Sequence, residues 1–161
     1  MTTTKHETEI IIDPKVPLVR IIREFDASPQ KVFRAHTDPD LIVHWLGPRG
    51  HEMRIDHFDC RTGGSYRYLH LSDGNEFAFR GTFHEVRPSS LIVQTFTFEG
   101  MPDSVALERM VLEDLGAGRT RLTATSLVED FESRDAFVAS GMEGGVREGY
   151  ERLDELLPTI G

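Results

Sequence analysis

The feature that most constrains the fold is a series of six strand-like segments followed by one long amphipathic helix. The six segments span about residues 51–59, 63–71, 76–86, 90–98, 105–114 and 119–127. Turn residues such as Gly63-Gly64 and Asp73-Gly74 separate them, as is typical of hairpins. Because parallel strands need long crossover connections, these short links predict antiparallel pairing.

The helix is predicted over residues 133–157. Its apolar side chains recur at steps of three and four and form one face, made of Val138, Met142, Val146, Tyr150, Leu153 and Leu157. A row of glycines, Gly141, Gly145 and Gly149, runs beside this face. Glycine costs up to about 1 kcal/mol at each helix-interior position. The row therefore indicates either close packing against another segment or space for a ligand.

The N-terminal part predicts one strand at residues 16–25 and then two short helices. Ser28-Pro29 and Asp38-Pro39 each place an N-cap residue before a proline at the first helical position. The second short helix is expected to continue to Trp45 and to end before Gly47.

Together these elements predict an α+β helix-grip fold, in which a curved antiparallel sheet of about seven strands wraps around the long helix. A chain of 161 residues suits one domain. We assign it to residues 16–161, after an arm of residues 1–15 that either adds an edge strand or stays flexible. A sheet curled around a helix rarely fills its interior, so we expect an apolar pocket with a few polar groups.

Composition excludes several functions. The net charge is −9, and no cluster of Lys and Arg is present, so we expect no nucleic-acid partner. No apolar run reaches the ~20 residues of a membrane span, and the polar N-terminus lacks the apolar core of a signal peptide. We therefore expect a soluble cytoplasmic protein without membrane insertion. One cysteine, Cys60, and seven scattered histidines form no metal-binding motif, so we expect no metal and no cofactor.

The alternation of the strands places many aromatic side chains on the inner face of the sheet. The residues expected to bind a ligand are Trp45, Tyr66, Tyr68, Phe79, Phe83, Gln94, Phe96, Glu108, Met110, Met142, Val146 and Tyr150. The same aromatic side chains could instead form ordinary core packing. Trp45 could either plug one end of the core or gate the mouth of the pocket.

Glu108 is the most unusual residue of this inner face, because it shares the face with Ala106, Met110 and Leu112. A buried carboxylate needs a partner or a raised pKa. The partner could be Tyr66, Tyr68, His70, Gln94 or an arginine. Glu108 is therefore the candidate catalytic residue or a polar anchor for the ligand. Alternatively, a β-bulge turns it to solvent, or it forms a structural ion pair.

Several stretches together resemble one known group. They are Asp38-Pro39 with residues 45–48, and residues 58–64, 79–83, 95–100 and 141–150. The chain is similar to the START-like SRPBCC superfamily over about residues 18–157. More narrowly, it resembles bacterial stand-alone domains related to the C-terminal domain of the Hsp90 ATPase activator, called AHSA-type. This resemblance implies a deep cavity between helix and sheet and hydrophobic ligands such as lipids or polyketides, but it implies no reaction.

Three functions remain open at this point. The first is binding of a small hydrophobic molecule in the pocket. The second is a cyclase, dehydratase or hydrolase acting on a polyketide-like substrate, with Glu108, a tyrosine or His70 transferring protons. The third is a protein-interaction factor that stimulates a chaperone ATPase. A homodimer that forms through an open sheet edge or the N-terminal arm also remains open.

Overall fold

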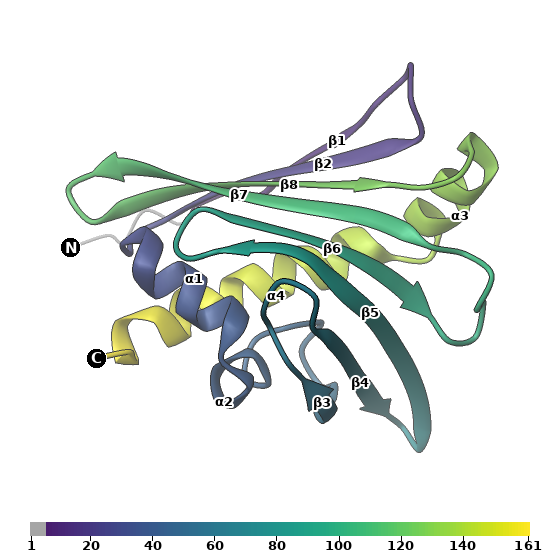
Figure 1. The fold of residues 1–161 in the computed structure, drawn as a ribbon, viewed down its shortest axis with the longest axis horizontal. Coiled ribbons are helices and arrows are strands. Elements are labelled where there is room, and N and C mark those ends of the chain that lie inside the picture. Colours follow the sequence, from purple (N-terminus) through teal and green to yellow (C-terminus); the bar gives the residue numbers. More distant parts are fainter. Residues whose placement is uncertain (1–5) are drawn as a thin grey trace.

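The computed structural model describes residues 6–161 and shows one eight-stranded antiparallel sheet that curves around a C-terminal helix (Figure 1). The strands are β1 (Glu9–Ile12), β2 (Leu18–Phe25), β3 (Glu52–Phe58), β4 (Ser65–Ser72), β5 (Asn75–Arg87), β6 (Leu91–Phe98), β7 (Ala106–Gly116) and β8 (Arg119–Leu127). Their order in the sheet is β1-β2-β8-β7-β6-β5-β4-β3. The predicted fold class is therefore confirmed.

The strand count is one higher than expected, because part of the N-terminal arm forms β1. Its four residues pair with β2, with Glu9 opposite Ile22 and Ile12 opposite Val19. Residues 1–5 of the arm lie outside the described residues. The other seven strands end within two residues of their predicted limits, since turn residues fix the ends of hairpin strands.

The two short helices follow β2, and both begin at the predicted caps. In α1 (Pro29–Thr37), Ser28 Oγ accepts a hydrogen bond of 3.3 Å from the Lys31 amide. In α2 (Pro39–Ile42), Asp38 Oδ1 accepts one of 2.9 Å from the Asp40 amide. Helix α2 ends at Ile42, earlier than predicted, and Trp45 lies in the turn that follows.

The prediction of one continuous helix over residues 133–157 was wrong. The chain forms α3 (Phe131–Ala139) and α4 (Met142–Leu156), and a short 3-10 turn, η1 (Leu157–Thr159), follows. The break lies at Gly141, whose φ of 89° is left-handed and interrupts the helical path. The apolar spacing continues across the break, so periodicity alone could not reveal it. Among the described residues, no helix is long and apolar enough to cross a membrane.

The core lies where the C-terminal half of α4 meets the concave side of the sheet. Tyr150, Leu153 and Leu157 are buried against Phe25 of β2 and Leu122 of β8. Helix α1 lies at this end of the molecule, and α3 lies at the opposite end (Figure 1). The hydrophobic effect therefore fixes one end of the long α4 to the sheet.

A buried arginine also joins the sheet to α4. Arg23 pairs in register with Leu122, so its side chain points into the concave side, where it is only 1% exposed. Its guanidinium forms a bidentate ion pair with Asp154 of α4, with a distance of 3.0 Å from Nη1 to Oδ1. It also lies 4.8 Å from the centre of the Phe25 ring. Asp154 thus neutralises a charge that would otherwise be buried alone.

We expect Asp154→Ala to lower the free energy of unfolding by about 3 kcal/mol, because it leaves the Arg23 guanidinium buried without a counter-charge. Urea denaturation measures this change. The neighbouring variant Glu155→Ala is the matched control, because it breaks the exposed ion pair between Glu155 and Arg49. It should cost less than about 1 kcal/mol. Equal losses in the two variants would contradict this role of Arg23.

Candidate functional site

The middle of the concave face is only half covered, unlike its end near α1. Five apolar side chains there pack against the core but keep accessible surface; they are Phe79, Phe96, Met110, Ala124 and Val146. We call these five residues the open concave region. Met110 and Ala124 are directly opposite each other on β7 and β8. Since inward side chains with accessible surface border space that water can enter, a ligand could contact the sheet here.

An aromatic ladder forms one wall of this region. Tyr66 and Tyr68 on β4 stack with ring centres 5.9 Å apart, Tyr68 and Phe79 stack at 5.5 Å, and Phe79 and Phe96 stack at 5.3 Å. The ladder crosses β4, β5 and β6. Stacked rings present a flat and rigid apolar surface, which suits a flat apolar molecule.

Gly81 leaves the space that the Tyr66 hydroxyl occupies. A Cβ atom at Gly81 would lie 2.6 Å from Tyr66 Oη and 2.0 Å from the Thr95 carbonyl oxygen. The Tyr66 hydroxyl donates a hydrogen bond of 2.6 Å to that carbonyl. The glycine on β5 is therefore required for the position of the first ring of the ladder.

Glu108 lies beside this ladder and points inward. Its neighbours in register are Gln94 on β6 and Ser126 on β8. Gln94 Nε2 donates hydrogen bonds of 3.0 Å to Glu108 Oε1 and of 3.3 Å to Tyr66 Oη. Of the partners considered from the sequence, the structure therefore places Gln94 on the carboxylate. The bulge in β7 lies farther along, between Asp114 and Gly116, so Glu108 keeps its inward register.

Burial raises the pKa of Glu108 to about 7, although the hydrogen bond from Gln94 and the nearby Ser126 hydroxyl lower it in part. Burial also raises the pKa values of Tyr66, Tyr68 and Tyr150, and the Glu108 carboxylate adds to each increase. The three phenols therefore stay neutral. Glu108 gains or loses its proton near neutral pH, so it can donate or accept a hydrogen bond there.

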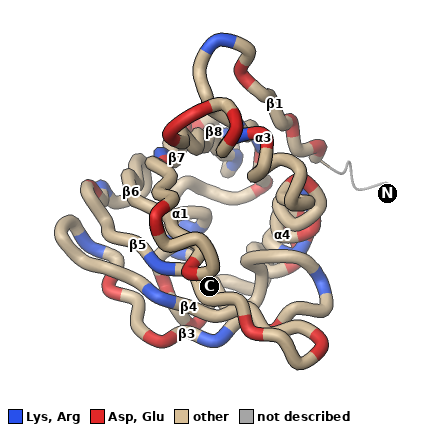
Figure 2. Tube along the Cα trace, turned by 90° about the vertical axis from the view of Figure 1, so that its right-hand side faces the viewer, with Lys and Arg blue, Asp and Glu red and all other residues tan. Residues whose placement is uncertain are grey.

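Charged residues on the outer surface, unlike Glu108, commonly have partners of opposite charge. Basic and acidic residues are interspersed along the chain (Figure 2). Many form ion pairs, such as Arg67 with Glu99 at 2.8 Å and Arg119 with Glu24 at 3.1 Å. Among residues 6–161, no cation forms an ion pair with Glu108. Within the described residues, Glu108 is therefore not part of a structural ion pair, which was one alternative considered from the sequence.

His70, the other proton-transfer candidate, lies at the edge of the ladder. Its ring meets those of Tyr68 at 5.4 Å and Phe79 at 5.7 Å. Burial, together with smaller contributions from His51 and Arg152, lowers its pKa to about 4. Its Nδ1 is buried and has no hydrogen-bond partner among the described residues. His70 is therefore a neutral imidazole, without a described hydrogen bond to Glu108.

The twelve residues predicted to bind a ligand fall into two groups. Phe79, Phe96, Gln94, Glu108, Met110, Met142 and Val146 are half-buried, whereas Tyr66, Tyr68, Phe83, Trp45 and Tyr150 are buried. Trp45 is 2% exposed, donates to the Ala35 carbonyl at 2.9 Å and stacks on Tyr150. Trp45 and Phe83 thus offer little surface to a ligand.

The glycines of the predicted row differ in how closely other segments pack against them. A Cβ atom at Gly149 would lie 3.3 Å from the Trp45 carbonyl oxygen and 3.4 Å from the Gly47 nitrogen. A Cβ atom at Gly145 would lie 3.6 Å from Pro48 Cδ, an ordinary contact, and one at Gly141 would meet no other atom within 4 Å. Close packing of α4 against the turn after α2 therefore explains Gly149.

Strand alternation groups Ser126 with Leu122 and Ala124 on the inner face, but sequence reasoning did not name Ser126 as a site residue, and it missed Arg23 as an inward-facing polar residue. Ser126 is 7% exposed, and its Oγ is buried without a hydrogen-bond partner among the described residues. Its place opposite Glu108 depends on the strand register, which cannot be read from the sequence alone. A sequence signal for Arg23 exists, because it falls on the same strand face as Val19, Ile21 and Phe25. Glu108 shares a face with apolar residues in the same way.

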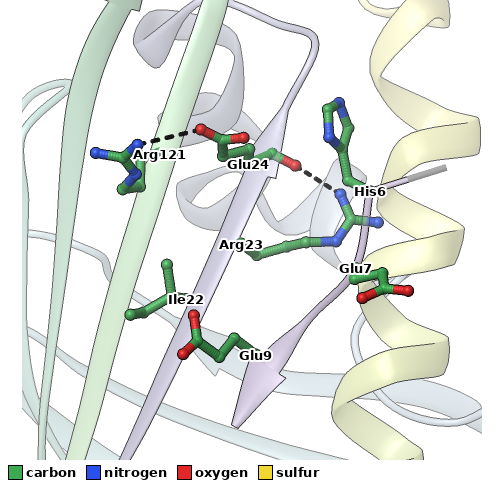
Figure 3. A pocket seen from close by; sticks show the side chains of 7 residues that line it. All are labelled: His6, Glu7, Glu9, Ile22, Arg23, Glu24 and Arg121. Atoms are coloured by element: carbon green, nitrogen blue, oxygen red, sulfur yellow. Dashed lines mark hydrogen bonds and ion pairs between the residues drawn. The ribbon is translucent and has the colours of Figure 1, made fainter. Parts of the chain in front are cut away.

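Two surface hollows lie away from this cluster. One, of about 290 Å³, is lined by His6, Glu7, Glu9, Ile22, Arg23, Glu24 and Arg121 (Figure 3). The other, of about 310 Å³, is lined by His44, Arg152, Glu155, Leu156 and Thr159. Polar and charged side chains dominate both linings, which does not suit an apolar ligand. The described residues contain no group of three metal-binding side chains.

The N-terminal arm borders the first hollow and links β2 to α4. His6 Nε2 lies 2.9 Å from Asp26 Oδ1, and Arg147 of α4 donates a hydrogen bond to the Thr8 carbonyl. In Figure 3, the Arg23 side chain extends from β2 toward the helix, next to His6 and Glu7 of the arm. The arm therefore helps to close one side of the grip.

We expect Glu108→Gln to stabilise the protein at pH 8 but not at pH 5. The folded protein holds the Glu108 proton more tightly than the unfolded chain does, since burial raises the pKa from 4.5 to about 7. Ionisation of Glu108 therefore costs stability progressively as the pH rises through this window. The gain from the variant should be about 3 kcal/mol at pH 8.

Urea unfolding at the two pH values tests this expectation. Glu113→Gln on the outer face of β7 is the matched control, because Glu113 is exposed and pairs with Arg121. Its effect should be below about 1 kcal/mol and similar at both pH values. A Glu108→Gln effect that does not change with pH would contradict the raised pKa.

Comparison with known proteins gives a consistent result. A model of the family "Activator of Hsp90 ATPase homolog 1-like protein" matches residues 26–158. A solved structure from Rhodobacter sphaeroides is 26% identical, with a TM-score of 0.84 over 95% of this chain and 99% of that one. One from Arthrobacter aurescens is 26% identical, with a TM-score of 0.86 over 95% and 92%.

A third structure is that of DynU16, described as a protein in the dynemicin biosynthetic locus. It is 23% identical, with a TM-score of 0.66 over 89% of this chain and 48% of DynU16. At this identity the likeness shows the fold alone. No curated protein matches the chain.

Proposed function

Because the chain belongs to the family of activator of Hsp90 ATPase homolog 1-like proteins, we propose that it binds a small hydrophobic ligand between α4 and the sheet. The ligand is lipid-like or polyketide-like and occupies the open concave region. The observation that carries this proposal is the half-buried state of its inward apolar side chains, Phe79, Phe96, Met110, Ala124 and Val146. Apolar surface that stays accessible on the inward face of a curved sheet suits contact with an apolar ligand.

The energetics support a ligand of modest size. Each 100 Å² of apolar surface removed from water contributes about 2.5 kcal/mol. A flat molecule lying on the ladder of Tyr68, Phe79 and Phe96 removes surface from both partners. The rings are already held in place by their neighbours on β4, β5 and β6, so binding costs little additional side-chain entropy. Gln94 and Glu108 then fix the orientation of the ligand through its polar group.

A second candidate function rests on one specific observation, the pKa of Glu108 near 7. A carboxyl group that exchanges its proton near neutral pH, beside an apolar surface, suits general acid–base catalysis. In a polyketide-like substrate, Glu108 would remove a proton next to a carbonyl or return it during cyclisation or dehydration. Turnover that follows the ionisation of Glu108 and is lost in Glu108→Gln distinguishes this function from binding alone.

Native mass spectrometry of the freshly purified full chain tests the binding proposal directly. We expect a bound mass that is released on denaturation and can be identified as a hydrophobic small molecule. The chain without added mass, together with no thermal shift across a panel of lipids and polyketides, would contradict the proposal.

A variant that fills the open concave region should prevent binding. We expect Ala124→Phe to weaken the binding of N-phenyl-1-naphthylamine, a neutral fluorescent probe, by at least about tenfold, because the new ring occupies the space a ligand needs. Fluorescence titration measures the affinity. The matched control is Thr123→Phe, since Thr123 follows the opposite parity of β8 and faces outward.

Thermal unfolding shows whether Ala124→Phe remains folded. If the added ring prevents folding, Met110→Trp on the neighbouring strand provides the same test. Unchanged probe affinity in a folded filling variant would place the probe elsewhere and would contradict the proposed site.

A further inference from the structure

We propose that the site selects ligands by a neutral hydroxyl group that binds between Glu108 and Ser126, and that it rejects ligands carrying a carboxylate. This inference rests on the proposed function and specifies the ligand class of the same site. The cluster that carries it lies on three adjacent strands, β6, β7 and β8, beside the aromatic ladder.

The two residues are placed to share one ligand atom. Glu108 and Ser126 are directly opposite each other in the antiparallel pair of β7 and β8. Side chains in such pairs project side by side, with Cβ atoms about 5 Å apart. A single oxygen atom of a ligand can therefore reach both the carboxylate and the hydroxyl.

Ser126 has hydrogen-bonding capacity that the protein does not use. Its side chain is 7% exposed, and its Oγ has no hydrogen-bond partner among the described residues. Ser126 is close enough to Glu108 to lower the pKa of the carboxyl group, yet the two form no hydrogen bond of good geometry. Buried hydroxyls are usually paired, so a missing partner at this position points to a ligand.

Glu108 has unused capacity as well. Its Oε1 accepts the hydrogen bond of 3.0 Å from Gln94, whose amide also contacts Tyr66 Oη. Within residues 6–161, no donor forms a hydrogen bond of normal geometry with Oε2. A ligand hydroxyl meets both needs, because it donates to Glu108 and accepts from Ser126. A pure hydrocarbon meets neither need, and a ligand carboxylate has no proton to donate.

The charges around Glu108 disfavour a second anion. The groups that face it are Tyr66 and Tyr68 from β4, Gln94 from β6, Ser126 from β8 and Tyr150 from α4, and all are neutral. Arg23 of β2 acts on Tyr150, but its guanidinium is already neutralised by Asp154. An ionised ligand would therefore meet the Glu108 charge without a compensating cation in a poorly hydrated site.

Binding of two matched aromatic probes tests this selectivity in the full chain. The probes are 2-naphthol and 2-naphthoate, which differ in carrying a hydroxyl or a carboxylate on the same ring system. At pH 8, we expect isothermal titration calorimetry to show at least roughly tenfold tighter binding of 2-naphthol, because ionised Glu108 repels the carboxylate. At pH 6, protonated Glu108 can donate to 2-naphthoate, so the preference should shrink.

Three variants separate the contributions. Glu108→Gln should reduce the preference for 2-naphthol to less than about threefold, because it removes the charge and adds an amide donor. Ser126→Ala should weaken the binding of 2-naphthol about fivefold, because it removes the second hydrogen bond. Glu113→Gln, the same change on the outer face of β7, should leave the preference intact.

Each outcome decides a different claim. A tenfold preference that collapses in Glu108→Gln and persists in Glu113→Gln supports the inference. Equal binding of both probes to the unaltered protein overturns the inference while leaving the proposed function in place. If neither naphthalene probe nor N-phenyl-1-naphthylamine binds, the proposed function fails, and the inference fails with it.

Discussion

The ion pair between Arg23 and Asp154 determines how α4 can sit on the sheet. The guanidinium is buried within the concave face, so the helix must bring a carboxylate to it. Arg147 and Arg152 add bonds from α4 to backbone carbonyls of the N-terminal arm and of the turn after α2. These polar contacts and the apolar C-terminal half of α4 attach the helix to the arm, to the turn after α2 and to one end of the sheet. The middle of the concave face is left half covered, and the candidate site lies there.

Glu108 shows how this open face is specialised. Burial destabilises the ionised carboxylate, and Gln94 compensates only part of that cost. An apolar residue between Met110 and Ala106 would give a more stable core. The neutral phenols of Tyr66, Tyr68 and Tyr150 lie near the carboxylate, and the carboxylate has no ion-pair partner among the described residues. A polar group that lowers stability in an apolar interior is typical of a site built for recognition or chemistry rather than for folding.

The aromatic ladder and the helix break show the limits of pattern reading. Strand alternation correctly grouped Tyr66 with Tyr68, because side chains two residues apart share a face. The same reasoning could not separate Phe79, which keeps accessible surface, from Phe83, which the core covers. That difference depends on which neighbours come close across the sheet. Apolar spacing did not indicate the break at Gly141, because it specifies a buried face and not the path of the backbone.

The sequence by itself determined the order of the strands and short helices, the antiparallel meander, the caps of α1 and α2, and the strand face that Glu108 shares with Ala106 and Met110. These features follow from local rules: hydrophobic period, turn chemistry and the parity of a strand. That this face points inward at Glu108 was settled only by the structure. Only the tertiary structure decided that Gln94 bonds to Glu108, that Ser126 lies opposite it, and that Arg23 meets Asp154. Those contacts join residues far apart in the chain, and their register is set by cooperative packing of the whole sheet against α4.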